Sequence, residues 1–192
     1  QTRLGTFLGM TLARDGGLWI SGAQGLAKLP APVRNLKADS EWRQIGLPDS
    51  PPLANLREPR EDDAGGVTVL AQSSAAAEVV AARFDGRSWN VRPAVPEPIR
   101  FAWNGPGPTE WMLAEGTLFS RQLDALNWAR DEDVPARRFF DMAIEASGTF
   151  WLATSDGLLR YSPSAWQPPG VLQNLRTSKA GGLSTAGLRP AL

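Results

Sequence analysis

Short apolar segments alternate with glycine-containing turns along most of the chain. Residues 9–13 (Gly-Met-Thr-Leu-Ala) precede an Asp-Gly-Gly turn at 15–17, and the β-forming residues 18–20 (Leu-Trp-Ile) precede a second glycine turn and another short apolar run. Bulky and β-branched residues favour strands, and glycine adopts the backbone conformations that hairpin turns require. The pattern therefore predicts a meander of short antiparallel strands.

The first of these segments recurs far along the chain. Residues 10–29 align without a gap on residues 142–161, at an offset of 132 residues. The identical pairs are Met10 and Met142, Gly16 and Gly148, Trp19 and Trp151, Gly25 and Gly157, and Leu26 and Leu158. This offset is three times roughly 44 residues, the length of a four-stranded propeller blade, so two further copies are expected between them.

The two intervening copies are unequal. The third copy, at 109–119, keeps the tryptophan as Trp111, whereas the second, at 63–70, has Thr68 in its place and lacks the later Gly-Leu. A second tryptophan series follows these positions by 15 to 23 residues and consists of Trp42, Trp89, Trp128 and Trp166. Trp103 lies outside both series.

The repeat predicts an all-β propeller of about four four-stranded antiparallel blades. Residues 1–170 divide into blades at approximately 5–48, 49–95, 96–135 and 136–170. Recurring glycines are expected at turns, and recurring tryptophans are expected to pack between sheets rather than to bind sugars or cations. These structural markers are Gly16, Trp19, Gly25, Trp42, Trp89, Trp111, Trp128, Gly148, Trp151, Gly157 and Trp166.

The marker pattern resembles the two-component-regulator propeller repeat, found in the sensor regions of bacterial signalling proteins. An aspartate or its substitute, one residue and a glycine precede an apolar-Trp-apolar strand and then Gly-Leu, at 15–26 and again at 147–158. The resemblance covers residues 5–170 and is weakest in the second blade, at Thr68 and the alanine-rich segment 75–82. Asp-box, quinoprotein-type and other tryptophan-bearing propellers remain alternatives.

The resemblance implies a part of a larger ring of about seven blades, in which residues 171–192 lead into a following blade. The alternative is a complete four-bladed ring with a flexible tail. Remaining blades or a partner chain are expected at the sheet edges. The resemblance also implies a periplasmic or extracellular location and a non-enzymatic role in sensing a small molecule such as a glycan fragment.

Two other functions are weighed against ligand sensing. A protein-interaction scaffold would present a large apolar patch or an open sheet edge to its partner. A hydrolase or lyase would need two acidic side chains converging with an arginine in the central channel, and the sequence spacing does not bring such residues together. We therefore predict that the chain is not an enzyme.

Composition narrows the chemistry of the chain. Its 192 residues include eight tryptophans and are 42% hydrophobic, which fits a folded globule rather than a disordered polymer. Twenty basic residues balance twenty acidic ones without forming a basic stripe, so nucleic acid is not an expected partner. The absence of Cys and His removes thiolate nucleophiles, Cys/His zinc sites and Ser–His pairs. No cofactor, metal or membrane span is predicted.

Candidate ligand contacts lie in equivalent turns of the repeat. Gln24, Glu115 and Asp156 fall between the second and third strands of three blades, where propeller turns crowd one face. Arg137 and Arg138 match anionic groups, although pairing with the acidic run 131–133 is the favoured interpretation. The acidic runs 61–63 and 131–133 are expected to be solvated loops rather than calcium or acid–base sites.

Overall fold

The computed structural model describes residues 3–37, 39–74, 78–105, 107–134, 137–145, 147, 149–162 and 165–167. These residues form sixteen strands and one short 3₁₀ helix, η1 (Val33–Asn35). The repeat marker Gly148 and the segment 171–192 lie outside the described residues.

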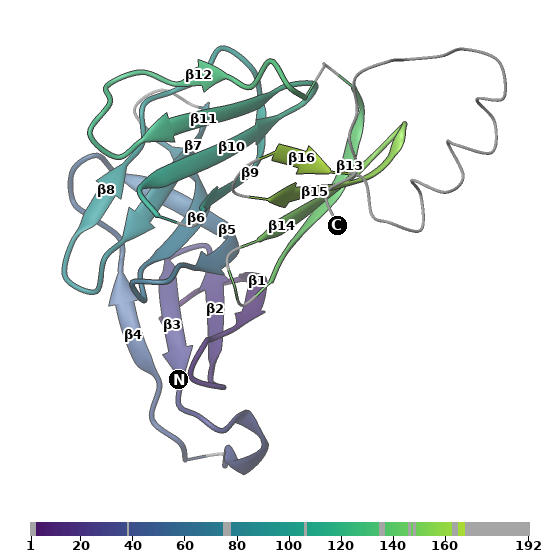
Figure 1. Ribbon diagram of the computed structural model, residues 1–192. Coiled ribbons are helices and arrows are strands. Elements are labelled where there is room, and N and C mark those ends of the chain that lie inside the picture. The colour runs from purple at the N-terminus through teal and green to yellow at the C-terminus, as the bar shows by residue number, and fades with distance from the viewer. Residues whose placement is uncertain are drawn as a thin grey trace, which may run out of the picture.

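The strands form four antiparallel sheets, blades 1 to 4, which follow one another along the chain (Figure 1). Blade 1 contains β1 (Phe7–Leu12), β2 (Leu18–Gly22), β3 (Gly25–Leu29) and β4 (Arg43–Gly46). Blade 2 contains β5 (Leu53–Glu61), β6 (Val67–Ser73), β7 (Glu78–Phe84) and β8 (Trp89–Val91). Blade 3 contains β9 (Ile99–Asn104), β10 (Thr109–Ala114), β11 (Leu118–Gln122) and β12 (Ala129–Arg130). Blade 4 contains β13 (Phe139–Ile144), β14 (Phe150–Thr154), β15 (Gly157–Ser162) and β16 (Ala165–Gln167).

Each blade is a simple meander whose strands pair in chain order, from β1-β2-β3-β4 to β13-β14-β15-β16. Neighbouring blades pack face to face, since β5 contacts β1 and β2, and β9 contacts β6 and β7. The predicted fold class is confirmed: the chain is all-β, with four four-stranded antiparallel sheets arranged as propeller blades.

Alternation along the strands directs side chains toward one neighbouring blade or the other. Trp19 in β2 packs into the core shared with blade 2, whereas the next residue, Ile20, packs on the opposite face of blade 1. Trp111 holds the corresponding position in β10 and packs into the core shared with blade 4. The second strand of these blades therefore directs its tryptophan toward the following blade.

Apolar cores fill the spaces between successive blades, and their burial drives the sheets together. Large buried side chains in these cores are Trp19 and Leu56 between blades 1 and 2, Leu70 and Met112 between blades 2 and 3, and Trp103, Trp111 and Phe150 between blades 3 and 4. Trp103, which stands outside the tryptophan series, stacks on Trp111 with ring centroids 6.3 Å apart.

Tryptophans of the outer strands connect adjacent blades through hydrogen bonds. The indole N–H of Trp89 donates to the carbonyl oxygen of Gly46 at 2.9 Å, which links β8 to the end of β4. The indole N–H of Trp128 donates in the same way to the carbonyl oxygen of Pro93 at 2.9 Å. Trp42 instead packs beside the small core on the outer face of blade 1.

Two marker glycines are required by local geometry. Gly16 has φ of +84°, a conformation that side chains disfavour, in the turn that joins β1 to β2. A Cβ atom on Gly25 would lie 2.6 Å from the carbonyl oxygen of Ile45 on the neighbouring strand β4. A side chain at either position would disturb blade 1.

Blade 1 has an exposed apolar surface on the side of β1 that faces away from blade 2. Met10 and Leu12, whose register partners are Ile20 and Leu18, lie on this face and are 71% and 73% exposed. Contiguous exposed apolar side chains are characteristic of contact surfaces. In the described part of the chain, no helix has the length and apolar character needed to cross a membrane.

Candidate functional site

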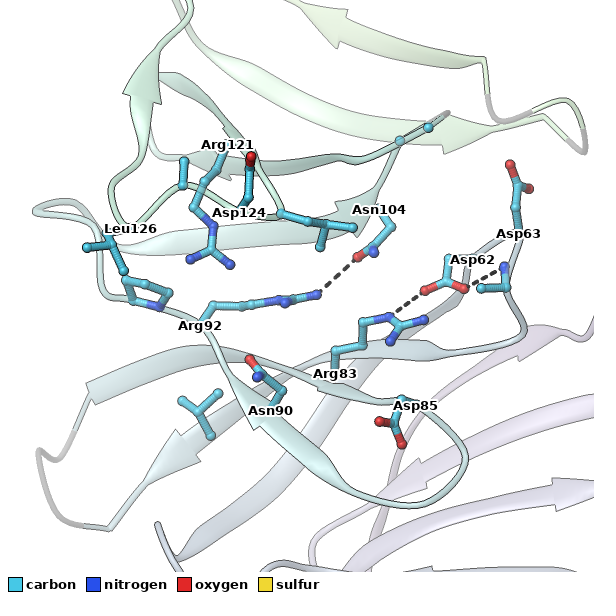
Figure 2. Close-up of a pocket in the computed structure, with 17 residues that line it drawn as sticks. Asp62, Asp63, Arg83, Asp85, Asn90, Arg92, Asn104, Arg121, Asp124 and Leu126 are labelled. Carbon is cyan, nitrogen blue, oxygen red and sulfur yellow. Dashed lines mark hydrogen bonds and ion pairs between the residues drawn. The ribbon is translucent and has the colours of Figure 1, made fainter.

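A cleft of about 660 Å³ lies between blades 2 and 3. Its walls come from the β5–β6 and β7–β8 turns of blade 2 and from the β9–β10 and β11–β12 turns of blade 3. Figure 2 shows Arg83 and Arg92 extending into the cleft from blade 2, and Arg121 extending into it from blade 3. Asn90 and Asn104 add amide groups to the walls, and Val91, Leu123 and Leu126 add apolar surface, so three arginines lie in a cleft of mixed character.

The repeat explains why Arg83 points into this cleft. In blade 1 the ammonium group of Lys28 lies 5.2 Å from the ring centroid of its register partner Trp19. In blade 4 the guanidinium of Arg160 lies 5.6 Å from the ring of Trp151 in the same way. In blades 1 and 4 a basic residue on the third strand therefore covers the tryptophan of the second strand, whereas the register partner of Trp111 in blade 3 is Ser120.

Blade 2 departs from this arrangement because Thr68 replaces the tryptophan. The register partner of Thr68 is Arg83, which has no indole to cover and instead donates from Nε to Asp62 at 2.6 Å. The buried hydroxyl of Thr68 donates to the Oδ1 atom of Asn104 in blade 3 at 3.2 Å. The loss of one repeat tryptophan thus places polar groups at the boundary between blades 2 and 3.

Asp62 organises the turn that supports Arg83. Its Oδ1 atom accepts hydrogen bonds from the backbone N–H groups of Ala64 and Gly66, each at 2.9 Å. The hydrogen bond to Asp62 raises the pKa of Arg83. The prediction that residues 61–63 form a solvated loop is wrong for two of them: Asp62 is buried, and the side chain of Glu61 is only 7% exposed.

A buried ion-pair network forms the floor of the cleft. Arg92, which follows β8, and Arg121 on β11 both pair with Glu110 on β10. The Nε atom of Arg121 donates to Oε2 of Glu110 at 3.0 Å, and Nη2 of Arg92 donates to Oδ1 of Asn104 at 3.4 Å. Burial lowers the pKa of Arg92, and the nearby positive charge of Arg121 lowers it further.

A second cavity of about 360 Å³ lies where the ends of β1, β5, β9 and β13 meet. Arg14 and Arg60 line it together with Glu61, Asp63 and Glu145. The expectation that sequence spacing keeps acidic and arginine side chains apart at the centre is therefore wrong. Bulges in β5, between residues 54 and 60, carry its distal end to this position.

This second cavity is called the central cavity below, and its acidic groups already have partners. Asp63 pairs with Arg14, and Glu61 accepts the backbone N–H of Arg14 at 2.6 Å. Glu145 accepts the indole N–H of Trp151 at 2.6 Å, and this hydrogen bond lowers the pKa of Glu145. At neutral pH Glu145 is therefore an ionised carboxylate and not a proton donor.

The residues that the sequence predicts on a ligand face lie elsewhere. None of them lines the cleft or the central cavity, and they are Gln24, Glu115, Asp156, Arg137 and Arg138. The structure brings Arg137 and Asp156 together, with Nη1 and Oδ2 3.2 Å apart. Arg138 lies over the ring of Phe140 at 5.9 Å. Gln24 and Glu115 are exposed in separate blades.

Two features of the sequence point to the polar groups of the cleft, although neither belongs to the regular repeat. Thr68 interrupts the tryptophan series, and Glu110 is a charged residue at the start of the apolar run 110–114. A charge within a buried strand requires a partner, which here comes from Arg92 and Arg121. Among the described residues, no group of three or more acidic side chains is placed to hold a metal ion.

Comparison with known proteins supports the fold alone. No family model matches the chain, and no curated protein matches it. Among solved structures, virginiamycin B lyase from Staphylococcus aureus, a catalytically inactive variant with quinupristin, has a TM-score of 0.56 and 14% sequence identity. The match covers 88% of this chain and 58% of the lyase.

Two further structures belong to different functional classes. The extracellular domain of a proposed hybrid two-component system from B. thetaiotaomicron has a TM-score of 0.51 and 14% identity, covering 84% of this chain and 22% of that one. YCF48 bound to D1 peptide has a TM-score of 0.52 and 15% identity, covering 86% of this chain and 53% of that one. The chain is similar to β-propellers and spans less than two thirds of the length of each of these three.

Proposed function

We propose that this chain is a non-enzymatic, ligand-sensing propeller region of a bacterial signal-transduction protein, of the two-component-regulator propeller type. It binds a small polar molecule in the cleft between blades 2 and 3. The observation that carries the proposal is the group of arginines that buried carboxylates hold in the walls of that cleft. Pockets with a few fixed, convergent polar groups are typical ligand sites.

The geometry of the cleft favours recognition. Arg83 and Arg92 come from blade 2 and Arg121 from blade 3, so a bound molecule would contact both blades. Because Asp62 and Glu110 fix these guanidiniums, little side-chain freedom is lost on binding. A ligand that prefers one spacing of the two blades shifts their packing, which is the change a sensor must report.

Further blades and an extracytoplasmic location are parts of the proposal. Trp151 is partly exposed, whereas the corresponding Trp19 and Trp111 are buried against a following blade. Met10 and Leu12 are exposed on the other free face. Both surfaces suit a neighbouring blade of a larger ring. The likeness to an extracellular domain of a two-component system supports a periplasmic or extracellular location.

Two other functions have an observation in their favour. The exposed apolar surface of β1, at Met10 and Leu12, suits a protein-interaction scaffold, and the similarity to a peptide-bound propeller agrees with this function. The acidic groups and arginines of the central cavity suit a hydrolase or lyase, and the similarity to a lyase agrees with that. Ligand sensing is preferred because those acidic groups are engaged in ion pairs and hydrogen bonds, and Glu145 is no proton donor.

The proposal is tested by a thermal-shift screen of glycan fragments and small metabolites against the whole chain. At least one compound is expected to raise the midpoint of unfolding. The variant Asn90→Trp places a bulky side chain in the cleft and is expected to abolish that rise. The matched control Arg87→Trp lies in the β7–β8 turn just before the strand that holds Asn90, outside the cleft lining, and is expected to retain the rise. A compound that stabilises both variants equally would count against the cleft.

A further inference from the structure

The buried guanidiniums at the floor of the cleft outnumber their carboxylates. The side chains of Arg92 and Arg121 are 7% and 8% exposed, and both pair with Glu110, whose side chain is 2% exposed. Arg83 and Asp62 form a separate pair and leave this balance unchanged. The buried part of the site therefore carries one excess positive charge.

Acidic side chains at the rim do not neutralise that charge. Asp63 pairs with Arg14, and its side chain is 52% exposed. Asp85 accepts backbone N–H groups of its own turn at 2.8 Å and is exposed, as is Asp124. Water and salt screen the charges of these exposed carboxylates strongly, whereas the buried guanidiniums are screened much less.

Several hydrogen-bond donors remain available to a ligand. Within the described part of the chain, the Nη1 groups of Arg92 and Arg121 have no acceptor. The Oδ1 atom of Asn104 accepts from Thr68 and Arg92, which fixes the amide and leaves its NH₂ group to donate. Arg121 points from blade 3 toward the side chain of Arg92, which itself runs along the cleft toward Asn104 (Figure 2).

We infer that the cleft binds a carboxylate group of its ligand between Arg92 and Arg121, with the amide of Asn104 as a third donor. Guanidinium forks match carboxylates in shape and charge, and a second carboxylate balances the excess positive charge. The inference deepens the proposed function by naming a ligand class, small carboxylates, and it rests on that function.

The test uses acetate as the simplest carboxylate, with chloride at matched ionic strength as the reference. Side-chain Nε–H signals of the ¹⁵N-labelled whole chain are followed during titration. Saturable shifts are expected for Arg92 and Arg121 and not for the exposed Arg138. Arg92→Gln, which leaves the balanced pair of Arg121 and Glu110, is expected to weaken acetate binding at least ~10-fold. Arg138→Gln is the matched control and is expected to bind as the wild type does.

A second variant is expected to act in the opposite direction. Glu110→Gln removes the competing carboxylate, so acetate binds more tightly and raises the unfolding midpoint more than in the wild type. If this variant does not fold, the comparison of wild type with Arg92→Gln still decides the question. Acetate shifts no larger than those of chloride, or unchanged binding in Arg92→Gln, would overturn the inference.

The outcome separates this inference from the proposed function. If acetate fails to bind while an uncharged compound is still excluded by Asn90→Trp, the carboxylate assignment is wrong and the cleft remains a ligand site. If no compound of the screen depends on the cleft, the proposed function fails as well.

Discussion

Replacing Glu110 by Gln tests the buried network between blades 2 and 3. The substitution keeps the shape of the side chain and removes the negative charge that two guanidiniums share. Glu110 is 2% exposed, and its partners Arg92 and Arg121 are 7% and 8% exposed, so water cannot replace the lost carboxylate. Two positive charges would then face each other across the interface of the two blades.

The expected loss is large for one substitution. Removing one partner of a buried ion pair lowers the free energy of unfolding by about 3–5 kcal/mol, because the remaining charge is left uncompensated. For a chain of this length, each kcal/mol lowers the midpoint by about 2–4 °C, so Glu110→Gln is expected to melt about 6–20 °C below the wild type. Domains are typically stable by only ~5–15 kcal/mol, so the variant lies near the limit of folding.

Urea unfolding at 25 °C, followed by tryptophan fluorescence, measures the change. The matched control is Glu115→Gln, which removes the same charge from an exposed position in the β10–β11 turn and is expected to change stability by less than about 0.5 kcal/mol. The reasoning is refuted if Glu110→Gln lies within about 1 kcal/mol of the wild type. Replacing Arg92, Glu110 and Arg121 together by Met, Leu and Met is expected to recover much of the loss, because no buried charge is left.

Two further outcomes are expected. Trp111→Ala is expected to lower the free energy of unfolding in urea by about 3–5 kcal/mol, and Trp151→Ala by about 1–2 kcal/mol because its ring is partly exposed. Equal losses would contradict the claim that Trp111 is buried against a following blade and Trp151 is not. Hydrogen bonds from Lys28 and from the backbone N–H of Gly17 lower the pKa of Asp15. The ionised Asp15 therefore stabilises the fold above about pH 4, and this stabilisation is lost as the pH falls below that value. Asp15→Asn is expected to flatten the decline of the unfolding midpoint between about pH 4 and 2, and an unchanged decline would contradict this.

The strands could be predicted because local residues determine them. Gly16 lies in a turn whose positive φ favours glycine, and Gly25 begins a strand where the neighbouring backbone leaves no room for a side chain. The apolar runs alternate between two buried faces, so a repeat of short strands can be predicted from the sequence. Trp19 and Trp111 recur because each packs against the following blade. Fold class therefore follows from the regular part of the repeat.

The cleft could not be predicted because it depends on departures from the repeat. In the sequence Thr68 is only a mismatch to the repeat. In the structure, the absence of an indole at this position leaves Arg83 to pair with Asp62. The pairing of Arg92 with Glu110 joins different blades, and no spacing along the chain specifies it. Selecting equivalent turns led instead to residues such as Gln24, which line neither cavity.

The most direct test asks where a stabilising compound from the screen binds. The chain contains no cysteine, so single cysteines can carry an environment-sensitive fluorophore. Leu126→Cys places the probe in the cleft lining, and Gln24→Cys places it in the β2–β3 turn outside the cleft. We expect a saturable change in emission from the probe at 126 and none from the probe at 24. A saturable change at 24 with none at 126 would contradict the cleft between blades 2 and 3 as the ligand site.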